Sequence, residues 1–241
     1  MEEEYENPLI LIRKSLSDYR SCLYLTNQKN AFYKSIKPFG YDKINNTNFY
    51  EMKIGLFDGF AQPIPIKRGT PRALLECSLC EGLERRDVGI TRITMDGNIP
   101  ADIYQNVKVV LAGEKVQDLI RGNRMVGVRF CDLEIEGESK LDDNHISKLK
   151  QIEILGRCYK IFTLDGLEIE HCPLCKRVPE NERIKADNGI QIIYDYWDGS
   201  NIFMFDYGLL SIIVTHRVKE IFERNKVSNV KFEPISEITM R

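Results

Sequence analysis

Four of the seven cysteines form two pairs with the spacing of metal ligands. The first pair lies in the segment Cys77-Ser-Leu-Cys80 and the second in the segment Cys172-Pro-Leu-Cys175. Two thiols separated by two residues lie on one tight turn and point to the same side, so each pair supplies half of a tetrahedral Zn²⁺ shell. The sequence therefore predicts one structural zinc site whose four thiolate ligands are Cys77, Cys80, Cys172 and Cys175.

Two other interpretations of the cysteine pairs are open from spacing alone. A thioredoxin-like redox pair is expected once in a chain, at the start of a helix that follows a strand. Four reduced thiols, or a site that binds metal only in part, are the other alternative. The glycine that commonly follows the second cysteine of a zinc knuckle is replaced by Glu81 in one turn and by Lys176 in the other. Because these residues lack the freedom of glycine at positive φ, we expect fewer backbone N–H bonds to the thiolates.

A segment with a strand-helix-strand pattern occurs twice, once after each cysteine pair. Val116–Phe130 and Val218–Phe232 match without a gap, and the identical pairs are Val116/Val218, Asn123/Asn225, Val128/Val230 and Phe130/Phe232. In each copy an apolar run is followed by apolar residues at helical spacing and then by alternation, which predicts strand, helix and strand. Asn123 and Asn225 are predicted to be the left-handed residues that end the helices. The alternative is that two short αβ units resemble each other through common patterning alone.

These patterns predict an α+β fold with internally duplicated strand-helix-strand halves. The first half is residues 1–140 and the second is residues 141–241, and each contains one CxxC pair and one αβ unit. The two pairs lie much farther apart than the roughly 15–20 residues of an ordinary zinc ribbon. We therefore expect split zinc-ribbon knuckles, one from each half, with the halves joined near residues 140–160 and packed through their sheets.

The composition is that of an ordinary globular protein, with 43% hydrophobic and 29% charged residues. It excludes the disordered, collagen-like and coiled-coil classes. A net charge of -2 provides no general attraction to phosphate backbones or anionic lipid. The acidic start of the chain, with an apolar stretch of only Leu9–Ile12, predicts no signal peptide and no membrane span. We expect a cytoplasmic protein, whose reducing compartment favours metal-bound cysteines over disulfides.

The sequence contains none of the common catalytic motifs. It has no Gly-x-Ser-x-Gly, phosphate loop, His-Glu-x-x-His or glycine-rich dinucleotide turn. The three histidines, His145, His171 and His216, are far apart in the sequence. We therefore predict a protein that is not an enzyme, although catalytic groups that assemble only in space leave no signal in spacing.

Two stretches are candidates for a partner-binding surface. The first lies between the second CxxC pair and its αβ unit and comprises Tyr194, Asp195, Tyr196, Trp197 and Asp198. Aromatic residues beside carboxylates are typical of interface anchors, although the tyrosines could also pack inward from an edge strand. The second is acidic and comprises Asp132, Glu134, Glu136, Glu138, Asp142 and Asp143. It is predicted to steer a basic partner, with a solvated strand and turn as the alternative.

The two distant CxxC pairs, each followed by an αβ unit, resemble the double-CXXCG motif immunity proteins of bacterial toxin systems. The tail carries most of the resemblance: an apolar strand leads from Phe203 into a helix that begins Thr215-His-Arg217, and a short strand ends at Phe232-Glu-Pro234. The resemblance implies a non-enzymatic cytoplasmic protein that binds a cognate toxin and blocks it. The aromatic stretch would then anchor the toxin and the acidic stretch would steer it.

The alternative function is a zinc-ribbon module that binds nucleic acid or belongs to a larger complex. Such a module needs a basic stripe near a knuckle. The candidates are Arg85, Arg86, Arg92, Lys176, Arg177, Arg183 and Lys185. Glutamates and an aspartate between these residues dilute the positive charge, so nucleic acid is the less favoured partner.

Overall fold

The structure is a computed structural model of the whole chain. It describes residues 48–55, 59–66, 72–80, 83–87, 91–106, 109–137, 139–186, 189–206 and 211–238. All of these belong to one compact unit, Ile44–Arg241. The stretch Leu9–Ile12, Glu81 and Glu138 lie outside the described residues. Within the described part of the chain, no helix is both long enough and apolar enough to cross a membrane.

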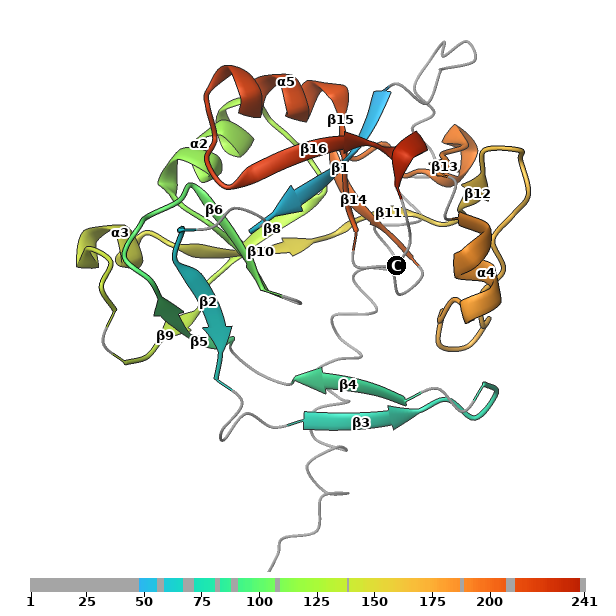
Figure 1. Cartoon of the computed structure of the whole chain (residues 1–241), viewed down its shortest axis with the longest axis horizontal. Coiled ribbons are helices and arrows are strands. Elements are labelled where there is room, and N and C mark those ends of the chain that lie inside the picture. The colour runs from blue at the N-terminus through green and yellow to red at the C-terminus, as the bar shows by residue number, and fades with distance from the viewer. Residues whose placement is uncertain are drawn as a thin grey trace, which may run out of the picture. The chain divides into compact units, whose positions relative to one another are not determined.

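The fold is α+β and consists mostly of strands, which confirms the predicted class (Figure 1). The first large sheet has the order β6 (Ile103–Asn106), β7 (Val109–Ala112), β10 (Lys150–Ile154) and β8 (Val128–Cys131). The second has the order β11 (Gly156–Cys158), β14 (Ile202–Phe205), β15 (Ile212–Thr215), β1 (Phe49–Ile54) and β16 (Val230–Pro234). The described helices are α2 (Glu114–Gly122), α3 (Asp143–Ser147), α4 (Glu180–Lys185) and α5 (His216–Arg224).

Three smaller sheets complete the described strands. One contains β2 (Gln62–Pro65), β5 (Arg92–Asp96) and β9 (Glu134–Ile135). Another pairs β12 (Phe162–Thr163) with β13 (Ile190–Gln191). The third is the hairpin of β3 (Arg72–Glu76) and β4 (Leu83–Asp87), which carries the first cysteine pair in its turn.

Both matching segments form strand, helix and strand, as predicted: β7-α2-β8 and β15-α5-β16. The helix ends differ from the prediction in one respect. Asn123 and Asn225 have negative φ, and the left-handed residues are the next ones, Arg124 (φ 51°) and Lys226 (φ 50°). The reason is that each asparagine side chain instead donates to the helix, from Asn123 Nδ2 to Leu119 O and from Asn225 Nδ2 to Ile221 O.

Each strand-helix-strand segment encloses a strand from the other half of the sequence. Strand β10 lies between β7 and β8 and is antiparallel to both, and β1 lies in the same way between β15 and β16. In each unit the helix connects two parallel strands that are not hydrogen-bonded to each other, so one further strand can pair between them. Strand β10 takes this place in the first sheet and β1 takes it in the second. Residues 1–140 and 141–241 thus each contribute a central strand to the sheet that holds the other's αβ unit.

The registers of the two sheets also agree. Ile154 is opposite Val128 in one sheet, and Ile54 is opposite Val230 in the other. On the other side of the central strands, Gln151 is opposite Leu111 and Glu51 is opposite Ile213. Strand β10 therefore pairs with β7 and β8 in the same register in which β1 pairs with β15 and β16.

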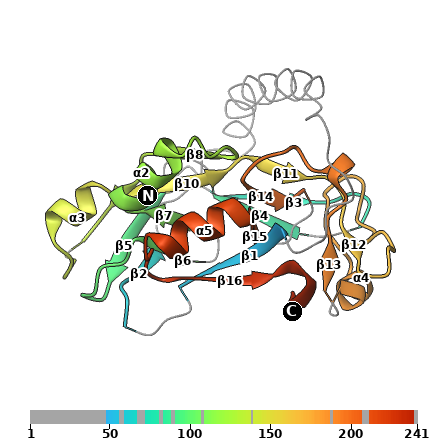
Figure 2. The same cartoon turned by 90° about the horizontal axis from the view of Figure 1, so that it is seen from above.

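The two αβ units share one hydrophobic core. Helices α2 and α5 lie side by side (Figures 1 and 2), and a single central cluster takes buried residues from both helices and both large sheets. Matching positions of the two units occur together in this cluster: Val116 and Val218, Ile120 and Phe222, Met125 and Val227, Ile154 and Ile54. Burial of one such side chain stabilises by about 1.5–3 kcal/mol, so each unit contributes to the stability of the core that the other one shares.

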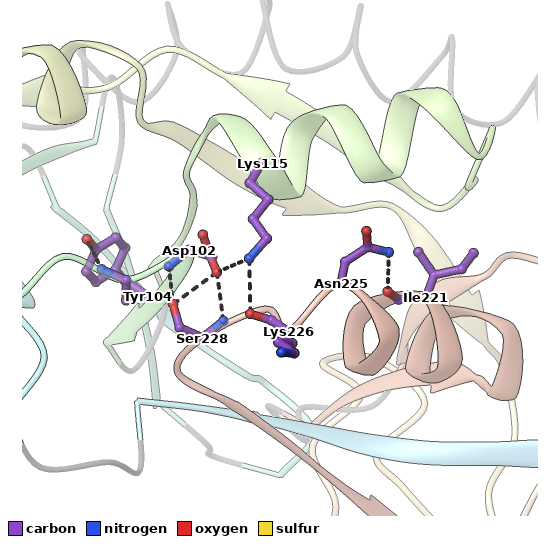
Figure 3. Close-up of polar contacts among 8 residues, drawn as sticks. Asp102, Tyr104, Lys115, Ile221, Asn225, Lys226 and Ser228 are labelled. Atoms are coloured by element: carbon purple, nitrogen blue, oxygen red, sulfur yellow. Dashed lines mark hydrogen bonds and ion pairs between the residues drawn. The ribbon is translucent and has the colours of Figure 1, made fainter.

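Polar contacts between the two αβ units recur at related positions, and Figure 3 shows those of Asp102. Asp102 Oδ2 accepts from the Ser228 amide at 2.8 Å and from Lys115 Nζ at 2.9 Å. Asn201 occupies the related position of the second unit, and its Oδ1 accepts from the Val126 amide at 3.0 Å. The Ser228 and Val126 contacts each join the loop after the helix of one unit to the residue that precedes a strand of the other half.

Asp102 should therefore contribute measurably to stability. We expect Asp102→Ala to lower the free energy of unfolding by about 1–3 kcal/mol, because the amide of Ser228 loses its acceptor. Asp102→Asn should lower the free energy of unfolding by less than half as much, since its side-chain oxygen can still accept from the Ser228 amide. Asparagine is also the residue at the related position, Asn201, where its oxygen makes the same kind of bond. Urea denaturation of both variants measures this, with the exposed Asp118→Ala as the control. Equal losses for the alanine and asparagine variants would contradict the proposed role of the acceptor.

Candidate metal centre

The four cysteines predicted as ligands converge on one point. Cys77 and Cys80 lie in the turn between β3 and β4, and Cys172 and Cys175 lie in a turn before α4. The sulfurs of Cys77 and Cys172 are 3.7 Å apart, those of Cys80 and Cys175 are 3.4 Å apart, and all four lie within 4.8 Å of one another. All four are free thiols. The fold thus brings together two pairs that are far apart in the sequence.

The sulfur positions fit a tetrahedral metal ion. A shell with metal–sulfur bonds of about 2.3 Å has sulfur–sulfur edges of roughly 3.8 Å, close to the two distances above. Four thiolates in this arrangement suit Zn²⁺ or iron. A closed set of four protein ligands leaves no open position for a substrate, which is typical of structural sites.

Both turns direct backbone N–H groups at their first sulfur. The amides of Cys80 and Leu79 donate to Cys77 and lower its pKa to about 6. The amides of Cys175 and Leu174 have the same relation to Cys172 and lower its pKa too. Hydrogen bonds to the charged form favour the thiolate, which is the state that binds metal.

Lys176 does not disrupt its turn, contrary to the expectation from its side chain. It adopts φ 63°, the region that glycine would occupy, and its amide donates to Cys172 O at 2.9 Å. The next amide, of Arg177, donates to the Cys175 sulfur and lowers its pKa, while burial and the sulfurs of its neighbours raise the pKa to about 12 overall. The expected loss of N–H bonds therefore does not occur in this turn, because the local backbone accepts the strain of a left-handed lysine.

The second turn is anchored in the body of the fold. The Cys172 amide donates to Arg177 O at 2.8 Å, which closes the turn. On either side of the turn, Ile169 and Val178 are buried in a hydrophobic cluster that also contains Phe203 and Ile213. Glu182, on α4, is almost fully buried and accepts from the Glu170 amide at 3.0 Å. These contacts hold Cys172 and Cys175 in place through protein groups alone.

Neither pair has the setting of a thioredoxin-like motif. Cys77 and Cys80 lie between two strands, and Cys172 precedes α4 by several residues. A redox pair of that type lies at a helix N-terminus, where the helix lowers the thiol pKa. The arrangement of the described residues thus favours a shared ligand set over two separate redox pairs.

Two residues of the turns were not singled out from the sequence. Leu79 and Leu174 occupy the same position in the two CxxC turns, and their side chains are 61% and 60% exposed. Their amides are also among the N–H donors to the sulfurs. The sequence signal that could have identified them is the leucine that both Cys-x-Leu-Cys turns share.

The aromatic stretch is only partly on the surface. Trp197 packs against Phe49 and Phe203, with ring centroids 5.1 Å and 5.6 Å away, and Tyr194 packs against Phe49 as well. Asp198 accepts from the Arg157 amide at 2.8 Å and from the Ser200 amide at 3.0 Å. Asp195 is exposed, and Tyr196 is half-buried with Lys160 Nζ 4.8 Å from its ring centroid. Tyr196 also packs against the buried Phe162, with ring centroids 5.7 Å apart, so Asp195 is the most exposed member of the stretch.

Much of the acidic stretch is paired with basic residues. Asp132 forms an ion pair with Lys150 at 2.6 Å, and Arg92 pairs with Glu134 at 3.6 Å and also with Glu136. Asp142 caps α3 by accepting from the amides of Asn144 and His145. These contacts reduce the local negative charge, and they also neutralise Arg92, a candidate nucleic-acid contact.

Comparison with known proteins adds no identification to this geometry. No protein-family model matches the chain, and no curated protein is significantly similar to it.

Proposed function

We propose that this chain is an immunity protein, which binds a cognate bacterial toxin in the cytoplasm and neutralises it without catalysis. The observation that carries the proposal is the convergence of two distant CxxC pairs on one set of four sulfurs. This is the feature that the sequence shares with the double-CXXCG motif immunity proteins. A closed, structural site suits a binding protein, because no ligand position is left for a reacting group.

We propose Zn²⁺ as the ion and Cys77, Cys80, Cys172 and Cys175 as its ligands. The two turns would then be the split knuckles of one zinc ribbon. Support comes from the sulfur–sulfur distances and from the N–H donors that favour the thiolate form of Cys77 and Cys172. When bound, the ion neutralises the thiolates and cross-links the turns. Elemental analysis of the purified chain should find about one zinc per chain, and iron in its place would contradict this assignment.

We also propose that the two αβ units arose by internal duplication. The matching registers, the matching residues of the central cluster and the related contacts of Asp102 and Asn201 support it. The sulfur contacts also join corresponding positions of the two CxxC turns: the first cysteines, Cys77 and Cys172, are in contact, and so are the second cysteines, Cys80 and Cys175. The metal site would then lie where the two halves of the repeat face each other.

We propose that Asp195 and Tyr196 contact the toxin, with Tyr194, Trp197 and Asp198 shaping this surface from beneath. Support comes from the exposure of Asp195 and from the aromatic packing that holds the stretch rigid. A rigid aromatic surface loses little conformational entropy on binding. The acids Asp132, Glu134, Glu136 and Glu138 would add a weaker, long-range attraction to a basic toxin.

Co-expression with the toxin encoded beside this chain tests the function. The wild-type chain should restore growth, and the double variant Asp195→Lys/Tyr196→Ala should lose at least about 2 kcal/mol of binding, roughly thirtyfold in Kd, if the pair is a hot spot. Asp118→Lys, on the exposed face of α2, makes the same charge change and should protect fully.

The possible results test the proposed contact surface and the proposed immunity role separately. Full protection by a folded double variant would eliminate this surface but not the immunity role. Failure of the wild-type chain to protect, combined with DNA or RNA binding that weakens steeply with salt, would instead support the nucleic-acid alternative.

A further inference from the structure

The hairpin β3–β4 forms a two-stranded sheet of its own. Its strands pair from Arg72 opposite Asp87 to Glu76 opposite Leu83, and no other described strand pairs with either of them. The sequence of β4, Leu83-Glu-Arg-Arg-Asp87, contains a single apolar residue. An isolated two-stranded hairpin is marginally stable at best in water. Something beyond its own backbone bonds must therefore hold this hairpin.

The turn of the hairpin brings its two cysteines to the second cysteine pair. Cys77, at the end of β3, is only 5% exposed, and its sulfur is 3.7 Å from that of Cys172. Cys80 is exposed, and its sulfur is 3.4 Å from that of Cys175. Four thiolates at such distances repel one another unless a cation lies among them or protons are shared. A metal ion bound by all four sulfurs would attach the hairpin to the second cysteine turn far more firmly than these sulfur contacts alone.

The two cysteine turns differ in how the rest of the protein supports them, although their sulfurs are in contact with each other. The Cys172–Cys175 turn is held by the buried side chains of Ile169 and Val178 and by the bond from the Glu170 amide to Glu182. The Cys77–Cys80 turn ends a hairpin that pairs with no other described strand. One cysteine pair therefore belongs to the folded body, and the other is carried by a hairpin whose strands pair only with each other among the described strands.

We propose that metal binding docks the β3–β4 hairpin onto a preformed Cys172–Cys175 turn, so that loss of the ion releases residues 72–87 while the two large sheets stay folded. This proposal rests on the metal site of the proposed function. It makes the hairpin a metal-dependent element, and the position of its charged residues Arg72, Arg85 and Arg86 relative to the body then depends on the ion.

Hydrogen exchange of the full-length protein, followed by mass spectrometry with zinc and after chelation, tests this. Chelation should speed exchange in residues 72–87 by at least about tenfold, because the hairpin opens freely once undocked. Helices α2 and α5 should remain protected after chelation, since their central cluster does not involve the metal. Cys172→Ser with zinc present should reproduce the chelated pattern, and Cys131→Ser, a cysteine outside the cluster, should reproduce the zinc pattern.

Metal content measured on the same samples separates this proposal from the proposed function. If the protein binds zinc and the hairpin is equally protected with and without it, docking by metal is overturned and the zinc site stands. If chelation leaves α2 and α5 unprotected, the ion holds the whole fold and the proposal is again overturned. If the purified protein binds no metal, both the zinc site and the docking proposal fail.

Discussion

Replacing Cys172 with serine should lower the apparent free energy of unfolding by several kcal/mol. The reason is that three remaining thiolates leave the ion an incomplete shell, and the binding free energy of a structural zinc ion is typically about 10–16 kcal/mol. Cys172 is the sensitive position because its sulfur meets Cys77 and its turn is part of the folded body. Chemical denaturation in a zinc-buffered solution measures the loss, and elemental analysis should show that the variant binds little zinc.

The dependence on zinc concentration gives a sharper readout of the same change. Above the dissociation constant, each tenfold rise in free zinc should stabilise the wild-type chain by about 1.4 kcal/mol, because the ion binds the folded state. The Cys172→Ser variant should respond much less at the same concentrations. Cys131→Ser, which removes a half-buried thiol outside the cluster, should retain the wild-type response. A Cys172→Ser variant that unfolds at the wild-type midpoint at every zinc concentration would contradict a structural metal site.

Gly127→Ala should be a second strongly destabilising change, with an expected loss of about 3 kcal/mol or more. Gly127 has φ 104°, and a Cβ there would lie 2.0 Å from the backbone oxygen of Ile202 and 2.7 Å from Ser200 Cβ. The strained backbone costs about 1–3 kcal/mol and the forced displacement of Ile202 adds about 1–3 kcal/mol. Gly127 also accepts from the amides of Leu155 and Gly156, so its displacement disturbs the chain that joins the two large sheets.

Gly199→Ala provides a matched control for Gly127→Ala. Gly199 also has positive φ, 84°, but no atom lies within 4 Å of the added Cβ. It should therefore show the backbone cost alone, about 1 kcal/mol. Thermal and urea unfolding of both variants measure the difference. Equal losses at the two positions would show that the close approach of Gly127 to Ile202 does not matter.

Local patterns were sufficient to predict the parts of this protein that depend on short stretches of chain. The spacing of Val116, Leu119 and Ile120, and of their counterparts after Val218, predicts a helix whatever surrounds it, because one apolar stripe must face a core. The CxxC spacing places two thiols on one side of one turn for the same local reason. These two patterns were enough to predict the α+β class and the clustering of the four cysteines, and the structure shows both.

Other features depend on contacts between distant residues, which no local pattern specifies. Strands β1 and β10 are apolar at alternate positions, but only the tertiary structure decides that each pairs between the two strands of the other half's αβ unit. Trp197 packs against Phe49 because β1 enters the second sheet, and Arg92 pairs with Glu134 because β5 and β9 are neighbours. Lys176 takes a left-handed backbone because its turn is held from both ends. Short stretches of the sequence thus specify the helices, the strands and the two cysteine turns, whereas the pairing of distant strands decides which other side chains are buried or ion-paired and which remain exposed.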